Sequence, residues 1–77
     1  MKIAALLLEG RKILQSANVE TAHLDCRLLA MEVLGRRRED LLRDSQDEVA
    51  TEVAVLFRDM INRCASGEPV SRILGRR

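Results

Sequence analysis

Apolar residues recur at intervals of three and four along most of the chain, and this spacing is typical of amphipathic α-helices. The clearest case is a face on which seven apolar residues fall together: Val49, Val53, Leu56, Phe57, Met60, Ile61 and Cys64. Leu and Ala supply 20 residues, whereas Val, Ile and Thr supply 12 and the single aromatic residue is Phe57. Because Leu and Ala favour helices while β-branched and aromatic residues favour strands, we expect an all-α fold.

The length of 77 residues suits one small domain, so residues 1–77 are expected to form a single helical unit. Hydrophobic residues make up 47% of the chain and charged residues 32%, which is typical of a globular protein. No apolar run approaches the roughly 20 residues needed to span a bilayer, so we expect no membrane partner. Cys26 and Cys64 are too few for a secreted disulfide scaffold, and this favours a cytoplasmic location.

The periodicity and the turn residues predict a compact bundle of about five helices, two of them short. The expected helices cover about 2–16, about 21–34, 36–43, a long segment from Ser45 to the stop at Gly67, and 70–74. Ser45 and Glu48 have the spacing of a capping box, which would start the fourth helix. Gly35, Gly67 and Gly75 are expected to end helices, because glycine readily adopts the left-handed conformation found there.

Two features predict how these helices pack. Gly10 lies on the apolar face of the first helix, where glycine costs about 1 kcal/mol relative to alanine, so another helix is expected to approach closely there. The second helix carries two apolar stripes: Leu24, Leu28 and Met31 on one side, and Ala22, Cys26, Leu29, Ala30 and Val33 on the other. We therefore expect this helix to be central and packed on both sides, so that Leu28→Ala would cost about 2–5 kcal/mol.

The sequence contains no residue set that could run a reaction. His23 and Cys26 lie three apart on one helix, as metal ligands can, but the chain has too few further ligands to complete a zinc site. Both cysteines fall in apolar patterns, unlike the electropositive pocket that a reactive thiolate needs. The four glycines are dispersed, whereas phosphate-binding loops bunch them after a strand. We expect no catalytic, cofactor-binding or metal-ligating residue in this chain.

The densest basic run is Arg36, Arg37 and Arg38, which we expect at an exposed helix junction. Arginine is enriched at protein interfaces, so this triplet is our candidate for partner contact. The 13 basic and 12 acidic residues give a formal charge of +1, far below that of a dedicated nucleic-acid-binding module. Direct nucleic-acid binding is therefore not expected, and a free-standing helical nucleic-acid or ribosome-binding module is the alternative hypothesis.

The C-terminal run is the most distinctive part of the sequence: Arg63-x-x-x-Gly67-Glu68-Pro69-Val70-x-x-Ile73-Leu74-Gly75-x-Arg77. It resembles the signature that closes the amino-terminal helical domain of the release factor glutamine methyltransferases, the HemK family. Upstream, Leu24-Asp25-x-x-Leu28-Leu29 resembles a helix of the same domain, which Val33-Leu34-Gly35 ends. The resemblance covers essentially the whole chain.

The resemblance implies the N-terminal substrate-recognition domain of a two-domain enzyme. Such enzymes transfer a methyl group from S-adenosylmethionine to the glutamine of the Gly-Gly-Gln motif in class I peptide chain release factors. The family's Rossmann-like catalytic domain carries an Asn-Pro-Pro-Tyr motif that this sequence lacks, so the chain alone is not expected to be catalytic or to hold the cofactor. The implied partners are the release factor and the enzyme's own C-terminal catalytic domain.

By the same resemblance, a set of C-terminal residues links the helical domain to the catalytic domain: Gly67, Glu68, Pro69, Gly75 and Arg77. Pro69 is suited to the first position of a helix, and Glu68 could cap that helix.

Overall fold

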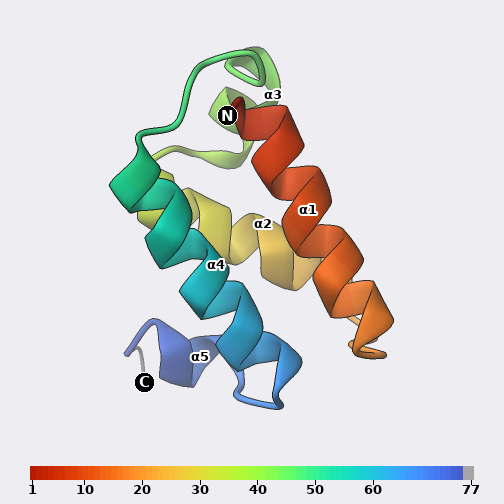
Figure 1. Cartoon of the computed structure of the whole chain (residues 1–77). Helices are drawn as coiled ribbons and strands as arrows, with labels where there is room; N and C mark the ends of the chain where they lie inside the picture. Colours follow the sequence, from red (N-terminus) through yellow and green to blue (C-terminus); the bar gives the residue numbers. More distant parts are fainter. Residues whose placement is uncertain (76–77) are drawn as a thin grey trace.

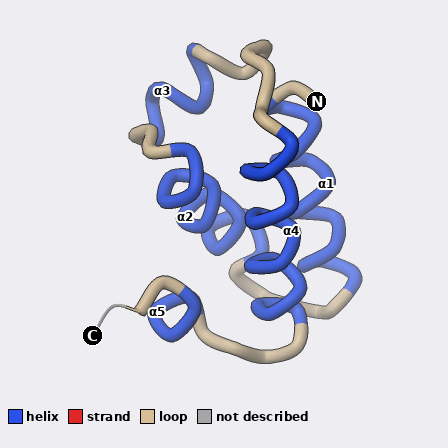
Figure 2. Tube along the Cα trace, turned by 60° about the vertical axis from the view of Figure 1, so that its left-hand side comes forward, coloured by secondary structure: helices blue, strands red, loops and turns tan. Residues whose placement is uncertain are grey.

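The computed structural model describes residues 1–75, and every regular element in that range is an α-helix (Figure 1). The helices are α1 (Ile3–Ser16), α2 (Ala22–Leu34), α3 (Arg38–Arg43), α4 (Thr51–Ala65) and α5 (Val70–Ile73). Figure 2 shows no strand in the described range, where an isolated antiparallel bridge joins Lys2 to Glu48. The prediction of an all-α bundle of about five helices, two of them short, is confirmed.

The three long helices, α1, α2 and α4, pack against one another and enclose the core. α3 lies at one end of the bundle, near the N-terminus, and α5 lies at the other end (Figures 1 and 2). The largest fully buried side chains come from all three long helices: Ile3, Leu6, Leu14, Leu29, Phe57 and Ile61. Full burial of such a side chain contributes about 1.5–3 kcal/mol, so this cluster is the main source of stability.

Gly10 allows α1 and α4 to approach closely, as the sequence predicts. A Cβ atom at Gly10 would lie 2.9 Å from Cε2 and 3.0 Å from Cζ of Phe57, and 3.1 Å from Cδ1 of Ile61. Real Cβ atoms rarely come so close to other atoms, and both neighbouring side chains are fully buried. The absence of a side chain at Gly10 therefore provides the space that the Phe57 ring needs.

α2 contacts each of the other four helices, which confirms its central position. However, the prediction that it is packed on both sides is wrong, because Leu24 is 42% exposed and Leu28 is 36% exposed. α1 and α4 cover the stripe of α2 that contains Cys26 and Leu29. The helices that remain to cover the stripe with Leu24 and Leu28 are the short ones, α3 and α5. Leu28→Ala is therefore expected to cost less than the range for a fully buried leucine.

The segment between α3 and α4 is a loop, although the sequence favours the start of a helix there. α4 begins only at Thr51, so the capping box predicted at Ser45 and Glu48 is wrong. The groups of this loop instead bind the N-terminus of the chain. The Val49 N–H donates to the Met1 carbonyl oxygen (2.8 Å), and the Met1 ammonium lies 2.8 Å from a carboxylate oxygen of Glu48.

The same loop caps the start of α1. The Ser45 carbonyl accepts a hydrogen bond from the Ala4 N–H (2.9 Å), and the Asp47 carbonyl accepts one from the Ile3 N–H (3.0 Å). The first N–H groups of a helix have no acceptor within the helix, so these tertiary bonds satisfy donors that would otherwise be unpaired. This use of the backbone explains why Ser45 does not start α4.

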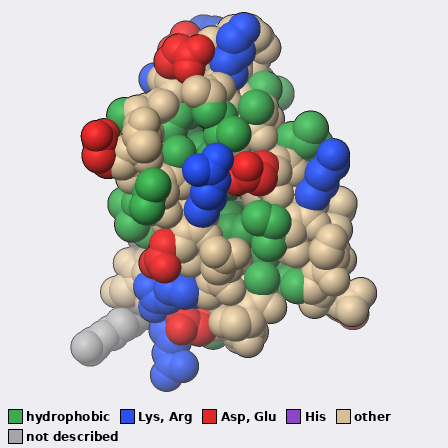
Figure 3. All heavy atoms as spheres, in the orientation of Figure 1, with side chains coloured by type: hydrophobic (Ala, Val, Ile, Leu, Met, Phe, Trp, Pro, Cys, Tyr) green, Lys and Arg blue, Asp and Glu red, His purple; other side chains and the backbone are tan. Residues whose placement is uncertain are grey.

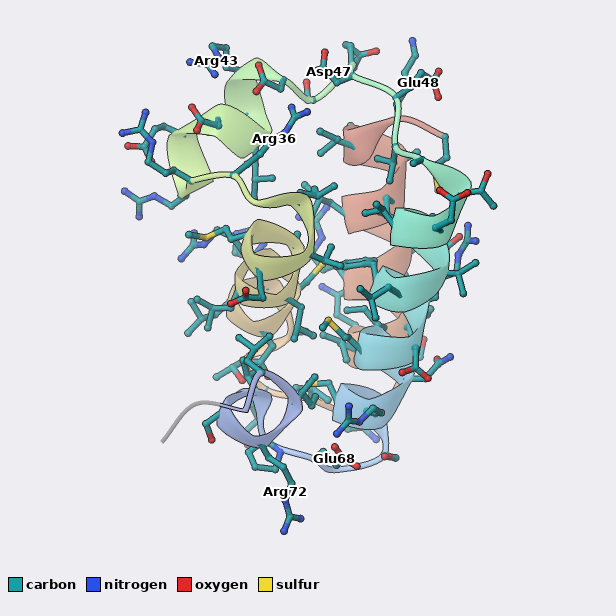
Figure 4. The ribbon with its side chains drawn as sticks, turned by 90° about the vertical axis from the view of Figure 1, so that its left-hand side faces the viewer. Arg36, Arg43, Asp47, Glu48, Glu68 and Arg72 are labelled. Atoms are coloured by element: carbon teal, nitrogen blue, oxygen red, sulfur yellow. The ribbon has the colours of Figure 1, made fainter. Side chains whose placement is uncertain are left out.

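Arg36 ties this loop to the end of α2 (Figure 4). Its Nη1 lies 2.9 Å from Oδ2 of Asp44 and 2.9 Å from Oδ2 of Asp47. Arg43 also contacts Asp44, with 3.0 Å between Nε and Oδ1. The hydrogen bond from Arg43, together with the charges of Arg43 and Arg36, lowers the pKa of Asp44 from its ordinary value of 3.8, and burial opposes this shift.

Gly10→Ala is expected to destabilise the domain, because the added Cβ would overlap the Phe57 ring. Such overpacking costs about 1–3 kcal/mol, which exceeds the gain of up to about 1 kcal/mol in helix propensity. Urea unfolding followed by circular dichroism measures the change. In a Phe57→Leu background the same substitution should cost less, and an equal cost in both backgrounds would contradict the proposed contact.

Asp44→Asn is expected to lower the urea midpoint at neutral pH, because it weakens the contacts with Arg36 and Arg43. The lowered pKa means that these ion pairs stabilise the fold above the ordinary value of 3.8 and stop doing so as the pH falls through the folded-state pKa. The difference between the wild type and the variant should therefore shrink on acidification. Asp59→Asn is the control, because Asp59 is exposed and has no ion pair among residues 1–75. A difference that persists in acid would count against this assignment.

Candidate functional site

The structure divides the arginine triplet predicted as a partner-binding set. α3 begins at Arg38, two residues later than the sequence predicts, and Arg37 precedes it as the N-cap. Arg36 is engaged with the loop carboxylates, and the Arg37 backbone N–H and Nε lie 3.3 Å and 3.4 Å from Oδ2 of Asp40. Arg38 has no ion pair in the described part of the chain. Of the three, Arg38 is therefore the one whose charge is available to a partner.

Arg38 lies on a groove of about 610 Å³ between α1, α2 and α3, which we call the α3 groove. Its lining comes from all three helices and the loop after α3: Ala4, Leu7, Leu8, Arg11, His23, Cys26, Arg27, Arg38, Glu39, Leu41, Leu42 and Ser45. Leu8 is 43% exposed and Leu42 is 80% exposed, so much of the apolar lining is open to solvent. The groove thus combines apolar side chains with polar and charged groups.

The charged groups of the α3 groove are mostly cationic. The described lining residues include three arginines, Arg11, Arg27 and Arg38, and a single carboxylate residue, Glu39. Nη1 of Arg11 lies 3.3 Å from Nδ1 of His23, and this pair lies on the α1 and α2 sides of the groove. A groove that combines apolar and cationic side chains is suited to an apolar partner segment that carries carboxylates.

Sequence reasoning missed Leu8, Arg27 and Leu42 as candidate binding residues. The available signal was the adjacency of Leu41 and Leu42 on a helix of only six residues. Neighbouring side chains on a helix point about 100° apart, so both leucines cannot face the same core. Leu41 is buried and Leu42 is not.

On the face formed by α1 and α4, charged side chains interrupt the apolar ones (Figure 3). Glu9 of α1 and Arg58 of α4 pair across this face, with 2.6 Å between Oε2 and Nε. The hydrogen bond and charge of Glu9 raise the pKa of Arg58, so the guanidinium stays protonated. This pair joins two helices of the bundle and leaves no free charge for a partner.

Both cysteines are buried and engaged within the core. Sγ of Cys26 donates to the Leu7 carbonyl (3.3 Å), and Sγ of Cys64 lies 3.6 Å from Oδ2 of Asp25. Burial raises the pKa of each thiol to about 11, and Asp25 adds to this effect at Cys64. Both groups are therefore protonated at neutral pH and unsuited to nucleophilic chemistry.

Metal-binding clusters and membrane-spanning helices are both absent from residues 1–75. This range contains no group of three or more His, Cys, Asp or Glu side chains placed to hold a metal ion. No helix within it is long and apolar enough to cross a membrane.

The C-terminal motif ends α4 and starts α5. Gly67 has a φ of 110°, and the N–H groups of Gly67 and Glu68 bond to the carbonyls of Cys64 (3.1 Å) and Arg63 (3.1 Å), a Schellman arrangement. Gly75 also has a positive φ, 69°. These glycines therefore terminate helices as predicted, because glycine adopts this conformation without a steric penalty.

Glu68 and Pro69 differ in detail from the prediction. Pro69 is the N-cap of α5, whose first helical residue is Val70, and α5 has no side-chain cap. The Glu68 carboxylate instead contacts Arg63, with 2.9 Å to Nε and 2.8 Å to Nη2, because the turn brings it back to the end of α4. Arg77 lies outside the described residues.

The two predicted sets of site residues lie apart. Figure 4 shows Arg36 and Asp47 toward the α3 end of the bundle, whereas Glu68 and Arg72 lie at the α5 end. The arginine triplet and the C-terminal motif therefore do not form one site.

The sequence matches the family model described as the PrmC N-terminal domain over residues 5–75. It is 39% identical over 75 residues to the release factor glutamine methyltransferase of Agrobacterium fabrum, covering 97% of this chain and 26% of that protein. It is 29% identical over 73 residues to the release factor glutamine methyltransferase of Nitratidesulfovibrio vulgaris, covering 95% of this chain and 25% of that protein. No solved structure matches significantly.

The chain spans about a quarter of the length of these two curated relatives. The family match begins within α1 and extends through the other four helices to Gly75 of the C-terminal motif, and it confirms the resemblance found in the sequence. The chain therefore belongs to the PrmC N-terminal domain family, the helical N-terminal domain of HemK-type release factor glutamine methyltransferases.

Proposed function

We propose that this chain is the release-factor-binding domain of an S-adenosylmethionine-dependent methyltransferase. The full-length enzyme would methylate the glutamine of the Gly-Gly-Gln motif in class I peptide chain release factors. The family match over residues 5–75 is the observation that carries this proposal, supported by relatives named release factor glutamine methyltransferase. The methyl transfer itself would take place in a separate catalytic domain.

S-adenosylmethionine is assigned to that catalytic domain, because the residues here do not fit the cofactor. Gly10 lies inside α1 against Phe57, and Gly35, Gly67 and Gly75 each lie just after a helix. No two glycines are close enough in sequence to form the glycine-rich loop expected of a Rossmann-like methyltransferase. This chain would therefore contribute binding and orientation, and no chemical step.

Binding by a separate domain suits the chemistry of the substrate. An amide nitrogen is a poor nucleophile, so its reaction depends strongly on accurate placement next to the methyl donor. Contacts remote from the reacting atoms can supply the free energy for that placement. The core of α1, α2 and α4 would provide a rigid support for such contacts.

The release factor is favoured over nucleic acid or the ribosome as the partner. In the arginine-rich region, Arg36, Arg37 and Arg43 each contact a carboxylate: Asp40, Asp44 or Asp47. These ion pairs reduce the positive potential on which phosphate binding depends. The buried free thiols of Cys26 and Cys64 are consistent with a reducing, cytoplasmic location, where release factors would be met.

Deletion of residues 1–75 from the full-length enzyme is expected to raise the KM for intact release factor by about tenfold or more, a loss of about 1.4 kcal/mol or more of binding free energy. The kcat on a short Gly-Gly-Gln peptide, which is too small to reach this domain, should stay within about twofold of the wild type. Steady-state kinetics on both substrates provide the measurement. An unchanged KM for the intact factor would refute the recruiting role and leave a purely structural one.

A further inference from the structure

We propose that the α3 groove is the docking site for an apolar segment flanked by carboxylates on the protein partner. The inference rests on the proposed function, since it specifies which surface of this domain meets the release factor and what chemistry that surface recognises.

The exposed leucines of the groove are not explained by folding. Leu41 attaches α3 to the core and is 4% exposed, whereas Leu42, its neighbour, is 80% exposed. Leu8 of α1 is also partly exposed and lines the same groove. Exposed apolar surface that lines a concave site gains free energy only when a partner covers it.

Most of the arginines of residues 1–75 that have no ion pair line this groove. Residues 1–75 contain nine arginines, and five of them contact carboxylates: Arg36, Arg37, Arg43, Arg58 and Arg63. Of the four without an ion pair in this range, three line the groove: Arg11, Arg27 and Arg38. The fourth, Arg72, lies on α5 at the far end of the bundle (Figure 4).

This distribution favours an acidic occupant. The chain as a whole has a formal charge of only +1, so the cationic character of the groove is local and not a general property of the surface. Glu39 is the only carboxylate in the lining, and a partner's carboxylates would meet the three unpaired guanidinium groups there. Complementary charge of this kind fixes the orientation of a partner and speeds its association.

The same features argue against a nucleic acid as the occupant. Single-stranded nucleic acids are usually held by Phe, Tyr or Trp side chains on which bases stack, and Phe57, the only residue of these three types, is fully buried. The apolar lining of the groove consists mainly of leucine side chains, and His23 is the one ring side chain among the described lining residues. The described lining residues all lie between Ala4 and Ser45, and α3 lies at the opposite end of the bundle from α5 (Figure 1), so a partner could bind there without contacting the C-terminal motif.

The test uses the full-length enzyme and intact release factor, with affinity measured by isothermal titration calorimetry. Leu42→Glu, and the double substitution Arg27→Glu with Arg38→Glu, are each expected to weaken binding at least tenfold. Two matched controls lie outside the groove: Val55→Glu replaces an exposed apolar residue of α4, and Arg72→Glu replaces the remaining unpaired arginine of residues 1–75. Both controls should bind within about twofold of the wild type.

Thermal unfolding of each variant separates lost binding from lost folding. Because the Leu42 side chain is largely exposed, Leu42→Glu should unfold at nearly the wild-type temperature. If Leu42→Glu unfolds at a clearly lower temperature, binding is measured instead with Leu42→Ala, which leaves the charge unchanged. Leu42→Ala should weaken binding by about threefold or more.

The outcomes distinguish this inference from the proposed function. If the wild-type enzyme does not bind the release factor, the proposed function fails. If the wild type binds but the groove variants bind equally well, the groove assignment is wrong and the proposed function stands. Two further outcomes would overturn the assignment if the groove variants keep their affinity for the release factor. Loss of RNA binding would mean that the occupant is a nucleic acid, and loss of self-association in size-exclusion chromatography would mean that it is a second copy of the chain.

Discussion

The close approach of α1 to α4 at Gly10 is the contact on which the rest of the domain depends. The Phe57 ring lies where a side chain at position 10 would be, so the only aromatic residue of the chain can be buried completely between the long helices. A domain this small buries only about 60% of the surface of its unfolded chain, so one large side chain makes up an unusual share of its core. The separation of α1 and α4 also fixes the surface on which α2 packs.

Tertiary hydrogen bonds at the other end of α1 determine where α3 lies. The loop carbonyls of Ser45 and Asp47 satisfy the first-turn donors of α1, and Arg36 holds the same loop to the end of α2. α3 is thereby fixed between two anchored segments, although a helix of six residues would not be stable alone. The α3 groove exists because of this anchoring.

The distribution of charge depends on the same contacts. Most arginines near α3 are neutralised by neighbouring aspartates, and the exceptions line the groove. A nearly neutral chain can thus present a groove that is cationic and partly apolar. In a methyltransferase that must position a weakly nucleophilic amide, such a surface would supply binding free energy at a distance from the reacting atoms.

Much of the fold could be predicted from the sequence because it depends on local properties. Helix formation follows from the spacing of apolar residues, and helix ends follow from the conformational freedom of Gly35 and Gly67. The close approach of α1 and α4 follows from one contact, at Gly10, which has no side chain. The C-terminal motif was specific enough to indicate the family, which the comparisons confirmed. The location of the proposed binding surface was not predictable in this way, because Arg36, Arg37 and Arg38 are equivalent in sequence.

The sequence by itself therefore determined the helices, their approximate ends and the family. Only the tertiary structure decided that Ser45 caps α1 instead of starting α4. The Ser45 carbonyl accepts a hydrogen bond from the Ala4 N–H, which has no acceptor within α1. Tertiary packing also decided which apolar stripe of α2 is covered and which of the three arginines stays free. Those choices depend on residues distant in the chain, whose positions become fixed only when the helices pack together.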